Sequence, residues 1–180
     1  MPHLNFEFKA KTNKLTDLEN KFQELHPEFI GEDHQIDTYF SVPKGRLKLR
    51  EGNIENSLIY YERENTAQPR LSQITLYNHV PGKGLKEILF KLYELQAVVD
   101  KKRKIYFIDN VKFHFDRIKD LGTFIEVEAI DQNASLGVQK LKEQCEIYGS
   151  FFGIRKAEYI GLSYSDLIIK SQQKIGVDLH

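Results

Sequence analysis

Charged and apolar side chains alternate at a period of two residues in several segments of the sequence. In one of them, Arg46, Lys48 and Arg50 alternate with Leu47 and Leu49. Successive side chains of a β-strand point to opposite faces, so this spacing puts the basic groups on one face and the apolar groups on the other. Guanidinium and ammonium groups match the oxygen atoms of phosphate groups. The polar face of this segment could therefore bind a phosphate-bearing ligand.

Other segments repeat this pattern with charges of both signs. Basic residues that share a strand face with one another or with a tyrosine are Lys9 and Lys11, Tyr61 and Arg63, and Lys101 and Arg103. Acidic residues on such faces are Glu7, Asp116, Glu126 and Glu128, with His114 beside Asp116. Paired carboxylates are the kind of oxygen ligand that hard divalent cations prefer. The polar faces thus carry cations suited to phosphate and anions suited to a metal ion.

The sorting of charge indicates how the strands are arranged. A single strand of this kind most often turns its polar face to water. Several of them favour a closed or nearly closed barrel, in which the charged faces look at one another and helices cover the apolar outside. Because unpaired charges are costly in a partly desolvated lumen, we expect ions or an anionic ligand there, such as Mg²⁺ or Mn²⁺ with a polyphosphate. The residues expected to point inward are Glu7, Lys9, Lys48, Arg50, Arg103 and Glu128, and those expected to point outward are Phe6, Phe8, Leu47, Leu49, Ile125 and Val127.

Turn-forming residues and hydrophobic periodicity predict the elements that position these side chains. Strands are expected at 4–11, 35–42, 46–51, 57–64, 71–79, 99–108, 112–118 and 123–129. Helices are expected at 12–25, 83–97 and 135–148, and 164–173 is expected to be helical or frayed. Short turns between the strands favour antiparallel neighbours. The sequence therefore predicts a mainly β (α+β) fold, an antiparallel eight-stranded barrel with amphipathic helices packed outside.

The composition limits the class of protein. A chain of 180 residues without a linker predicts one domain over 1–180. Lys plus Arg and Asp plus Glu number 26 each, so no overall charge favours binding to nucleic acid or to a membrane. Neither a secretory signal nor an apolar run of about 18 residues is found, which predicts a cytoplasmic protein. A lone Cys145 allows no intramolecular disulfide and no cysteine metal cluster.

Ordered short motifs resemble those of a known family. The N-terminal Asn5-Phe6-Glu7-Phe8-Lys9 resembles the Glu-x-Glu-x-Lys signature of the CYTH family. Its members include class IV adenylyl cyclases, thiamine triphosphatases and inorganic triphosphatases, all with the triphosphate tunnel metalloenzyme fold. The chain looks most like the class IV adenylyl cyclase-like branch. The resemblance continues in order at Asp37 to Phe40, Gly45 to Glu51, Leu58 to Arg63, Lys101 to Tyr106, His114 to Asp116, Leu121 to Glu128 and Ser163 to Leu167.

The resemblance implies roles for individual residues. Those expected to hold Mg²⁺ or Mn²⁺ are Glu7, Asp116, Glu126 and Glu128. Those expected to contact the triphosphate are Lys9, Lys48, Arg50, Lys101 and Arg103, with weaker support for Arg46, Arg63, Lys11 and His114. Glu7 and Lys9 are the expected catalytic residues. The substrate would be a nucleoside triphosphate, thiamine triphosphate or inorganic triphosphate, turned over by cyclisation to cyclic AMP and pyrophosphate or by hydrolysis, in a monomer or homodimer.

Departures from the family pattern leave two functions open. Asn5 stands where the first signature glutamate usually stands, which removes one negative charge from the expected metal site. Tyr61 occupies the approximate place of a lysine, although Arg63 could send a cation into the same region. The chain is then either a metal-dependent triphosphate enzyme or a non-catalytic binder of nucleotide or polyphosphate with a weakened metal site. A barrel for an apolar ligand is disfavoured by the charged lumen.

Overall fold

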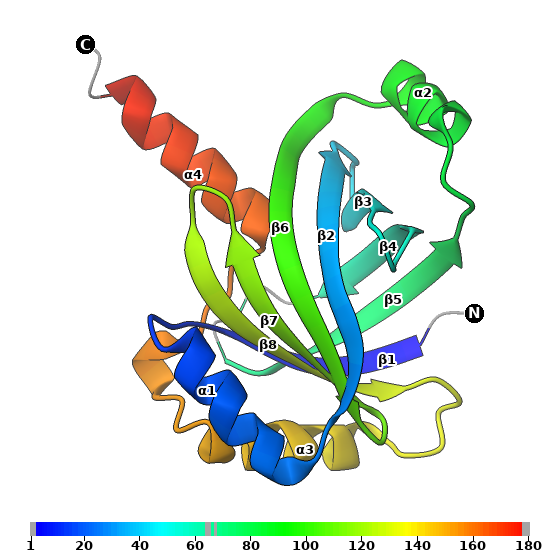
Figure 1. Cartoon of the computed structure of the whole chain (residues 1–180). Helices are drawn as coiled ribbons and strands as arrows, with labels where there is room; N and C mark the ends of the chain where they lie inside the picture. Colours follow the sequence, from blue (N-terminus) through cyan, green and yellow to red (C-terminus); the bar gives the residue numbers. More distant parts are fainter. Residues whose placement is uncertain (1–2, 64–65, 67, 178–180) are drawn as a thin grey trace.

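The computed structural model of the chain describes residues 3–63, 66 and 68–177. Within these residues, eight antiparallel strands close into a barrel in the order β1-β5-β4-β3-β2-β6-β7-β8, and β8 pairs with β1 (Figure 1). The predicted antiparallel eight-stranded barrel is confirmed. The strands are β1 (His3–Lys11), β2 (Glu28–Phe40), β3 (Arg46–Glu51), β4 (Ser57–Arg63), β5 (Arg70–Asn78), β6 (Leu95–Ile108), β7 (Val111–Ile118) and β8 (Gly122–Asp131).

Helices pack against the outside of this barrel (Figure 1). They are α1 (Leu15–Phe22), α2 (Lys83–Leu92), α3 (Val138–Phe151) and α4 (Tyr164–Val177). No helix among the described residues has both the length and the apolar character needed to cross a bilayer. Phe22 of α1 and Leu141 of α3 are buried in one cluster with the outward aromatic and aliphatic side chains of β1, β7 and β8. Leu89 of α2 covers Leu49 of β3, and Ile168 of α4 lies in a cluster with Val99 of β6.

The outward residues predicted from alternation are confirmed in these clusters. Phe6, Phe8, Ile125 and Val127 belong to the buried core that α1 and α3 cover. Leu47 and Leu49 lie in the cluster beneath α2. Burial of a side chain of this size contributes about 1.5 to 3 kcal/mol. The apolar faces therefore hold the helices on the barrel, and the opposite faces of the same strands are left to line its lumen.

Two boundaries predicted from the sequence are wrong. β2 begins at Glu28 rather than at residue 35, because residues 28–34 pair along the far half of β6 although they are mostly polar. The predicted helix 83–97 ends at Leu92, because Tyr93 is extended and Ala97 pairs with Tyr39 of β2. A helix would leave the β2 backbone groups at this position without their ladder partners.

Helix ends elsewhere also differ from the prediction. The helix expected over 12–25 is α-helical only over α1 and continues as a 3₁₀ turn at Gln23–Leu25. The helix expected from residue 135 begins at Val138, because the Asp131 carboxylate accepts hydrogen bonds from the backbone N–H groups of residues 135 to 137. The C-terminal helix α4 extends beyond the predicted 164–173.

Candidate functional site

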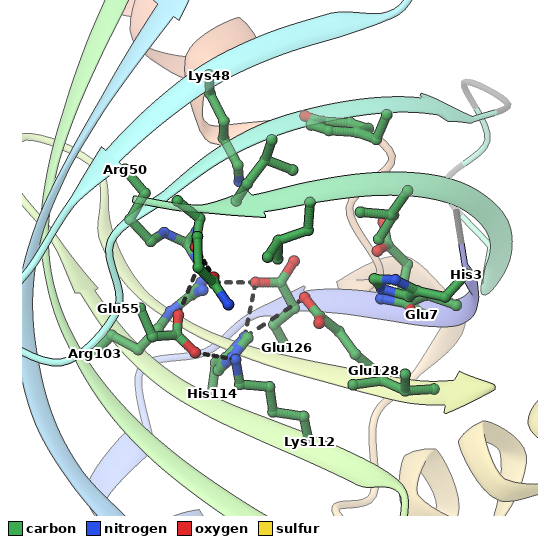
Figure 2. Close-up of a pocket in the computed structure, with 18 of the residues that line it drawn as sticks. His3, Glu7, Lys48, Arg50, Glu55, Arg103, Lys112, His114, Glu126 and Glu128 are labelled. Atoms are coloured by element: carbon green, nitrogen blue, oxygen red, sulfur yellow. Dashed lines mark hydrogen bonds and ion pairs between the residues drawn. The ribbon is translucent and has the colours of Figure 1, made fainter. Parts of the chain in front are cut away.

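The lumen of the barrel contains a cavity of about 930 Å³ (Figure 2). All eight described strands contribute to its lining, β2 through Tyr39 alone, and so does the start of α4. The side chains predicted to point inward all line it, namely Glu7, Lys9, Lys48, Arg50, Arg103 and Glu128. The charged lumen predicted from the period-two pattern is therefore confirmed.

One group of basic side chains is fixed by buried carboxylates. The Arg50 guanidinium donates from Nε and Nη2 to the two oxygens of Asp37, both at 3.0 Å. Lys101 Nζ donates to Asp37 Oδ2 at 2.5 Å. Burial alone raises the pKa of Asp37, but the charges of Arg50 and Lys101 outweigh it and hold that pKa well below its ordinary value. Asp37 is thus an ionised anchor for two cations that were predicted to bind phosphate.

Arg103 is held in the same way on the other side of the lumen. Its Nε and Nη2 donate to the two oxygens of Asp116 at 2.7 and 2.6 Å, and Nη2 also donates to Glu126 Oε2 at 2.8 Å. The Tyr164 hydroxyl donates to Asp116 Oδ2 at 2.7 Å. Asp116, predicted as a metal ligand, is fully buried with both oxygens engaged, and it does not line the cavity. Asp116 is therefore placed to hold the Arg103 guanidinium in a fixed orientation.

A second group, which we call the loose cations, consists of Lys9, Lys48 and Arg63. Lys9 Nζ lies 3.5 Å from Glu126 Oε1, and Lys48 Nζ lies 3.6 Å from an oxygen of Asp37. Both distances exceed the usual range for a hydrogen bond. Arg63 donates from Nη1 to Glu7 at 2.8 Å, but its buried Nε and Nη2 find no hydrogen-bond partner among the described residues. These donors are therefore available to an anion.

Aromatic rings support the loose cations. Lys9 Nζ lies 4.0 Å from the centre of the Tyr164 ring, and the Tyr61 ring lies 5.6 Å from Lys48 Nζ and 5.1 Å from the Arg63 guanidinium carbon. Cation–π contacts orient a cation without occupying its hydrogen-bond donors. Burial lowers the pKa of Lys9, although the charge of Glu126 opposes this shift. The tyrosine that replaces an expected lysine thus supports two neighbouring cations.

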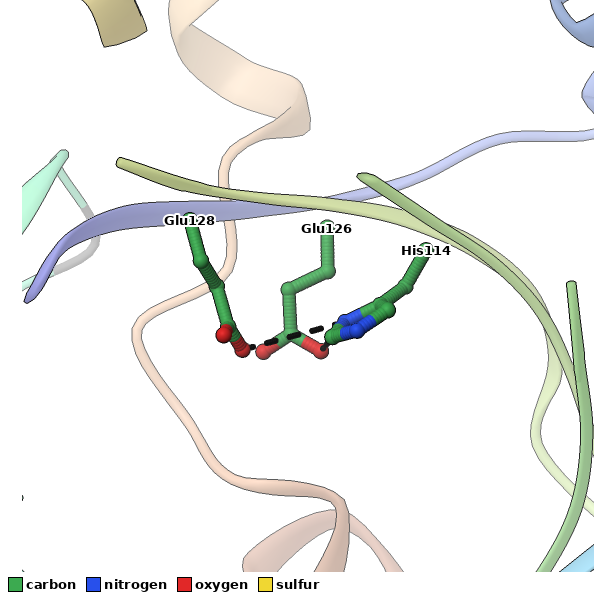
Figure 3. Close-up of side chains that lie close together, drawn as sticks. All are labelled: His114, Glu126 and Glu128. Atoms are coloured by element: carbon green, nitrogen blue, oxygen red, sulfur yellow. Dashed lines mark hydrogen bonds and ion pairs between the residues drawn. The ribbon is translucent and has the colours of Figure 1, made fainter. Parts of the chain in front are cut away.

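Three side chains of β7 and β8 form a cluster suited to a metal ion (Figure 3). His114, Glu126 and Glu128 each offer one ligand atom within 4.8 Å of the others. His114 Nδ1 lies 3.4 Å from Glu126 Oε2 and 3.7 Å from Glu128 Oε1. Burial, with the charges of Glu126 and Glu7, raises the pKa of Glu128 to about 7. Burial, with the charge of Arg103, lowers the pKa of His114 to about 3, so its imidazole is neutral and can act as a ligand.

The donor set of this cluster fits a divalent cation. Carboxylate oxygen suits Mg²⁺ and Mn²⁺, and a neutral imidazole suits the transition metals. His114 Nε2 and Asn5 Oδ1 are buried and have no hydrogen-bond partner in the described part of the chain. Asn5 and the cluster line the same cavity. The residues that would hold the ion are therefore Glu126, Glu128 and His114, with Asn5 as a further oxygen donor.

The remaining predicted site residues lie elsewhere. Glu7 Oε1 accepts hydrogen bonds from Arg63 at 2.8 Å and from Arg70 at 3.4 Å, so it faces cations rather than the cluster. Arg46 pairs with Asp166 at 2.9 Å outside the lining of the cavity. Lys11 is exposed at the end of β1 and does not line the cavity. The structure thus brings together two of the four predicted metal ligands and separates Arg46 and Lys11 from the predicted phosphate contacts.

Some residues of the candidate site were not predicted from the sequence. Asp37 lies on the inward face of β2 with Gln35 and Tyr39, within the strand predicted over 35–42, so alternation could have identified it. Glu55 and Lys112 also line the cavity and form an ion pair. Glu55 lies in the β3–β4 connection, where no periodic signal marks a residue as inward. Lys112 shares a face with His114 and could have been predicted.

Comparisons with known proteins agree with this fold. The sequence model of the CYTH domain matches residues 3–152. None of the curated proteins matches the sequence. Solved structures are similar in fold, and one is a conserved hypothetical protein from Pyrococcus furiosus, with a TM-score of 0.78 and 23% identity over 91% of this chain and 99% of that one.

Two further structures carry functional descriptions. A candidate adenylate cyclase from Vibrio parahaemolyticus has a TM-score of 0.74 and 18% identity, covering 92% of this chain and 97% of its own. A candidate adenylyl cyclase from Hippeastrum, described as having a dominant triphosphatase activity, has a TM-score of 0.63 and 11% identity, covering 94% of this chain and 96% of its own. At these identities the likeness concerns the fold.

Proposed function

The chain belongs to the CYTH domain family, and we propose that it binds a triphosphate in the lumen cavity and processes it with a divalent metal ion. The observation that carries the proposal is the set of loose cations. Lys9, Lys48 and Arg63 line the cavity, and Arg63 keeps two buried nitrogens without a partner among the described residues. Buried N–H groups left unpaired are costly, so phosphate oxygens that accept from them would be bound favourably.

The roles of the residues follow from their contacts. The loose cations would neutralise charge on the phosphate oxygens, which is the main requirement for phosphoryl transfer. Glu7 would orient Arg63, and Asp116 would orient Arg103 beside Glu126. A bound Mg²⁺ or Mn²⁺ would supply Lewis-acid stabilisation of the same oxygens. In this proposal Lys9 is the predicted catalytic residue with the most direct access to the substrate.

Two reactions are compatible with such a site. Attack of a ribose 3′-hydroxyl on the α-phosphorus of ATP, with loss of its proton, would form cyclic AMP and release pyrophosphate. Attack of water on a terminal phosphorus would release orthophosphate. Positioning and charge neutralisation serve both, so the nucleophile that the lumen admits decides between them. Membership of the CYTH domain family and the descriptions of two proteins of similar fold support this pair of reactions.

A non-catalytic binder is the second candidate. It is favoured by Asn5, which supplies an amide oxygen in place of a carboxylate, and by the pairing of Glu126 with Arg103 and Lys9. Fewer free anionic oxygens weaken the affinity for a hard divalent cation. In this reading the loose cations would hold the polyphosphate without turnover.

One experiment separates the two candidates. The purified protein is incubated with Mg²⁺ or Mn²⁺ and with ATP, thiamine triphosphate or inorganic triphosphate, and cyclic AMP, pyrophosphate and orthophosphate are quantified. Product that depends on metal and is reduced in Lys9→Gln, but not in the exposed Lys102→Gln, is expected for the enzyme. Triphosphate binding without any product would support the binder, and absence of both would contradict the proposal.

We further propose that residues 1–180 form a single domain acting in the cytoplasm as a monomer or homodimer. The CYTH match covers most of the chain, and α4 packs on the barrel beyond it. The equal numbers of basic and acidic residues give no reason to expect nucleic acid or a membrane as a partner. Size-exclusion chromatography with light scattering would determine the oligomeric state.

A further inference from the structure

The side chain of Glu55 enters the lumen from the connection between β3 and β4 (Figure 2). Its Oε2 accepts a hydrogen bond from Arg50 Nη1 at 2.9 Å, and its Oε1 pairs closely with Lys112 Nζ. Gln35 Nε2 adds a further hydrogen bond to Oε2 at 3.1 Å. Both oxygens of this carboxylate are therefore bound by groups that could equally bind a phosphate.

The backbone of this connection is fixed by a buried carboxylate. Asp33 is fully buried and accepts hydrogen bonds from the backbone N–H groups of Asn53, Ile54 and Glu55 at 2.6, 2.9 and 2.9 Å. A Cβ atom at Gly52 would lie 2.7 Å from both oxygens of Asp33, so a residue without a side chain is needed there. The connection therefore holds Glu55 in place rather than leaving it to swing into solvent.

The carboxylate of Glu55 lies beside Arg50, which follows the loose cation Lys48 along the lumen. Lys48 and Arg50 are consecutive inward residues of β3, and such residues follow one another along the strand axis. A chain of phosphoryl groups that begins at Lys48 and extends past Arg50 would next reach the donors of Arg50 Nη1 and Lys112. Glu55 already occupies those donors.

We propose that Arg50 and Lys112 form an additional anion subsite that the chain fills with its own Glu55, and that this resident carboxylate limits the length of the polyphosphate the lumen accepts. The inference rests on the proposed binding of a triphosphate in the same cavity. A triphosphate reaches the loose cations without disturbing Glu55. A linear polyphosphate of four phosphoryl groups must displace the Glu55 carboxylate, which the fold holds in place. If the carboxylate stays, its negative charge repels the fourth phosphoryl group.

The discrimination follows from repulsion as well as from lost contacts. Like charges in a partly desolvated site repel strongly, and specificity often depends on such an unfavourable contact with the wrong ligand. The surrounding charges of Lys112 and Arg50 outweigh the effect of burial and hold the pKa of Glu55 well below its ordinary value. Glu55 therefore stays anionic over the range in which a polyphosphate is charged.

Affinities for inorganic triphosphate and linear tetrapolyphosphate, measured by calorimetry in chelator, test this inference. The variants are Glu55→Gln, Glu55→Gln with Lys112→Gln, and Glu51→Gln as a matched control. Glu51 is four residues away, pairs with Lys86 at 2.6 Å and does not line the lumen cavity. Thermal melts of each variant check that it is folded.

Glu55→Gln is expected to raise the tetrapolyphosphate affinity relative to triphosphate by about tenfold or more, as gain of a charge-assisted contact implies. The gain should disappear when Lys112→Gln is added, and Glu51→Gln should match the wild type. An unchanged ratio in a folded Glu55→Gln variant, or an equal gain for both ligands, would overturn the role of Glu55 in length selection. Failure of the wild type to bind triphosphate would instead count against the proposed function, and tetrapolyphosphate binding gained by Glu55→Gln would then still support the subsite. Absence of binding by every variant would overturn both.

Discussion

Asp37 and Arg50 face each other across the β2–β3 ladder and join through two parallel hydrogen bonds, each 3.0 Å long. Arg103 and Asp116 repeat the arrangement across β6 and β7. Both arginines are thereby held by the sheet before any ligand binds, which is the preorganisation that electrostatic catalysis requires. The lumen combines such fixed cations with the loose cations, whose donors are still available.

Replacement of Asp37 should strongly destabilise the protein. Asp37→Asn leaves Arg50 and Lys101 buried with one negative charge fewer, and breaking a buried ion pair by removing one partner costs about 3 to 5 kcal/mol. The free energy of unfolding is measured in urea. Asp100→Asn is the control, because Asp100 pairs with His34 at the surface and such a pair is worth about 0 to 1 kcal/mol. Equal stabilities of the two variants would contradict the role of Asp37.

The low pKa of Asp37 in the folded protein predicts that the free energy of unfolding decreases in acid. The pKa of Asp37 is lower in the folded protein than its unfolded value of about 3.9, so its contribution is fully present above that pH. It is lost as the pH falls through the folded pKa. Unfolding experiments in urea between neutral pH and pH 2 should therefore show a smaller loss of stability for Asp37→Asn than for the wild type. Parallel curves for the two proteins would show that Asp37 is not the titrating group.

A third prediction concerns His114 and the choice of metal. An imidazole ligand favours Co²⁺ and Mn²⁺ over Mg²⁺, so these ions should raise the melting temperature of the wild type more than Mg²⁺ does. His114→Gln should lose this difference and change the visible absorption of bound Co²⁺, whereas the exposed His34→Gln should keep both. Identical metal responses of wild type and His114→Gln would remove His114 from the ligand set.

Asn5 allows the metal site to be strengthened. Asn5 lies one inward step from Glu7 on β1, and its buried Oδ1 lacks a partner among the described residues. Asn5→Glu adds an anionic oxygen, which should raise the affinity for Mn²⁺ and any metal-dependent turnover. Repulsion from Glu7 and Glu128 should lower the melting temperature in chelator and be relieved by Mn²⁺. A variant that melts like the wild type with and without Mn²⁺ would place the ion elsewhere.

The sequence predicted the lumen well because alternation is a strictly local property. Lys48 and Arg50 are inward whenever Leu49 is outward, whatever the rest of the chain does. Alternation assigns a residue to the inner or the outer face of its strand, but it does not say how far along the barrel axis the residue lies. Arg46 and Lys11 alternate in step with the lumen residues of their strands, but they occupy strand ends and lie outside the cavity.

The pairing of the charges could not be predicted in the same way. Whether Arg103 is fixed or available depends on its cross-strand neighbour Asp116, and this register is set by the turn between β6 and β7. Glu55 carries no periodic signal, because its position depends on backbone hydrogen bonds from the β3–β4 connection to Asp33. Site residues on strands were therefore accessible to sequence analysis, and those that depend on register or on a connecting loop were not.

Binding of inorganic triphosphate, measured by calorimetry for the wild type, Lys9→Gln and Lys11→Gln, tests most directly whether the loose cations hold the ligand. The two lysines lie on the same strand and have the same charge, but only Lys9 lines the cavity. We expect saturable binding by the wild type and Lys11→Gln, and an affinity reduced by about 10- to 100-fold in Lys9→Gln, as loss of a charge-assisted contact implies. Absence of binding by the wild type, or equal affinities of the two variants, would contradict a triphosphate site in the lumen.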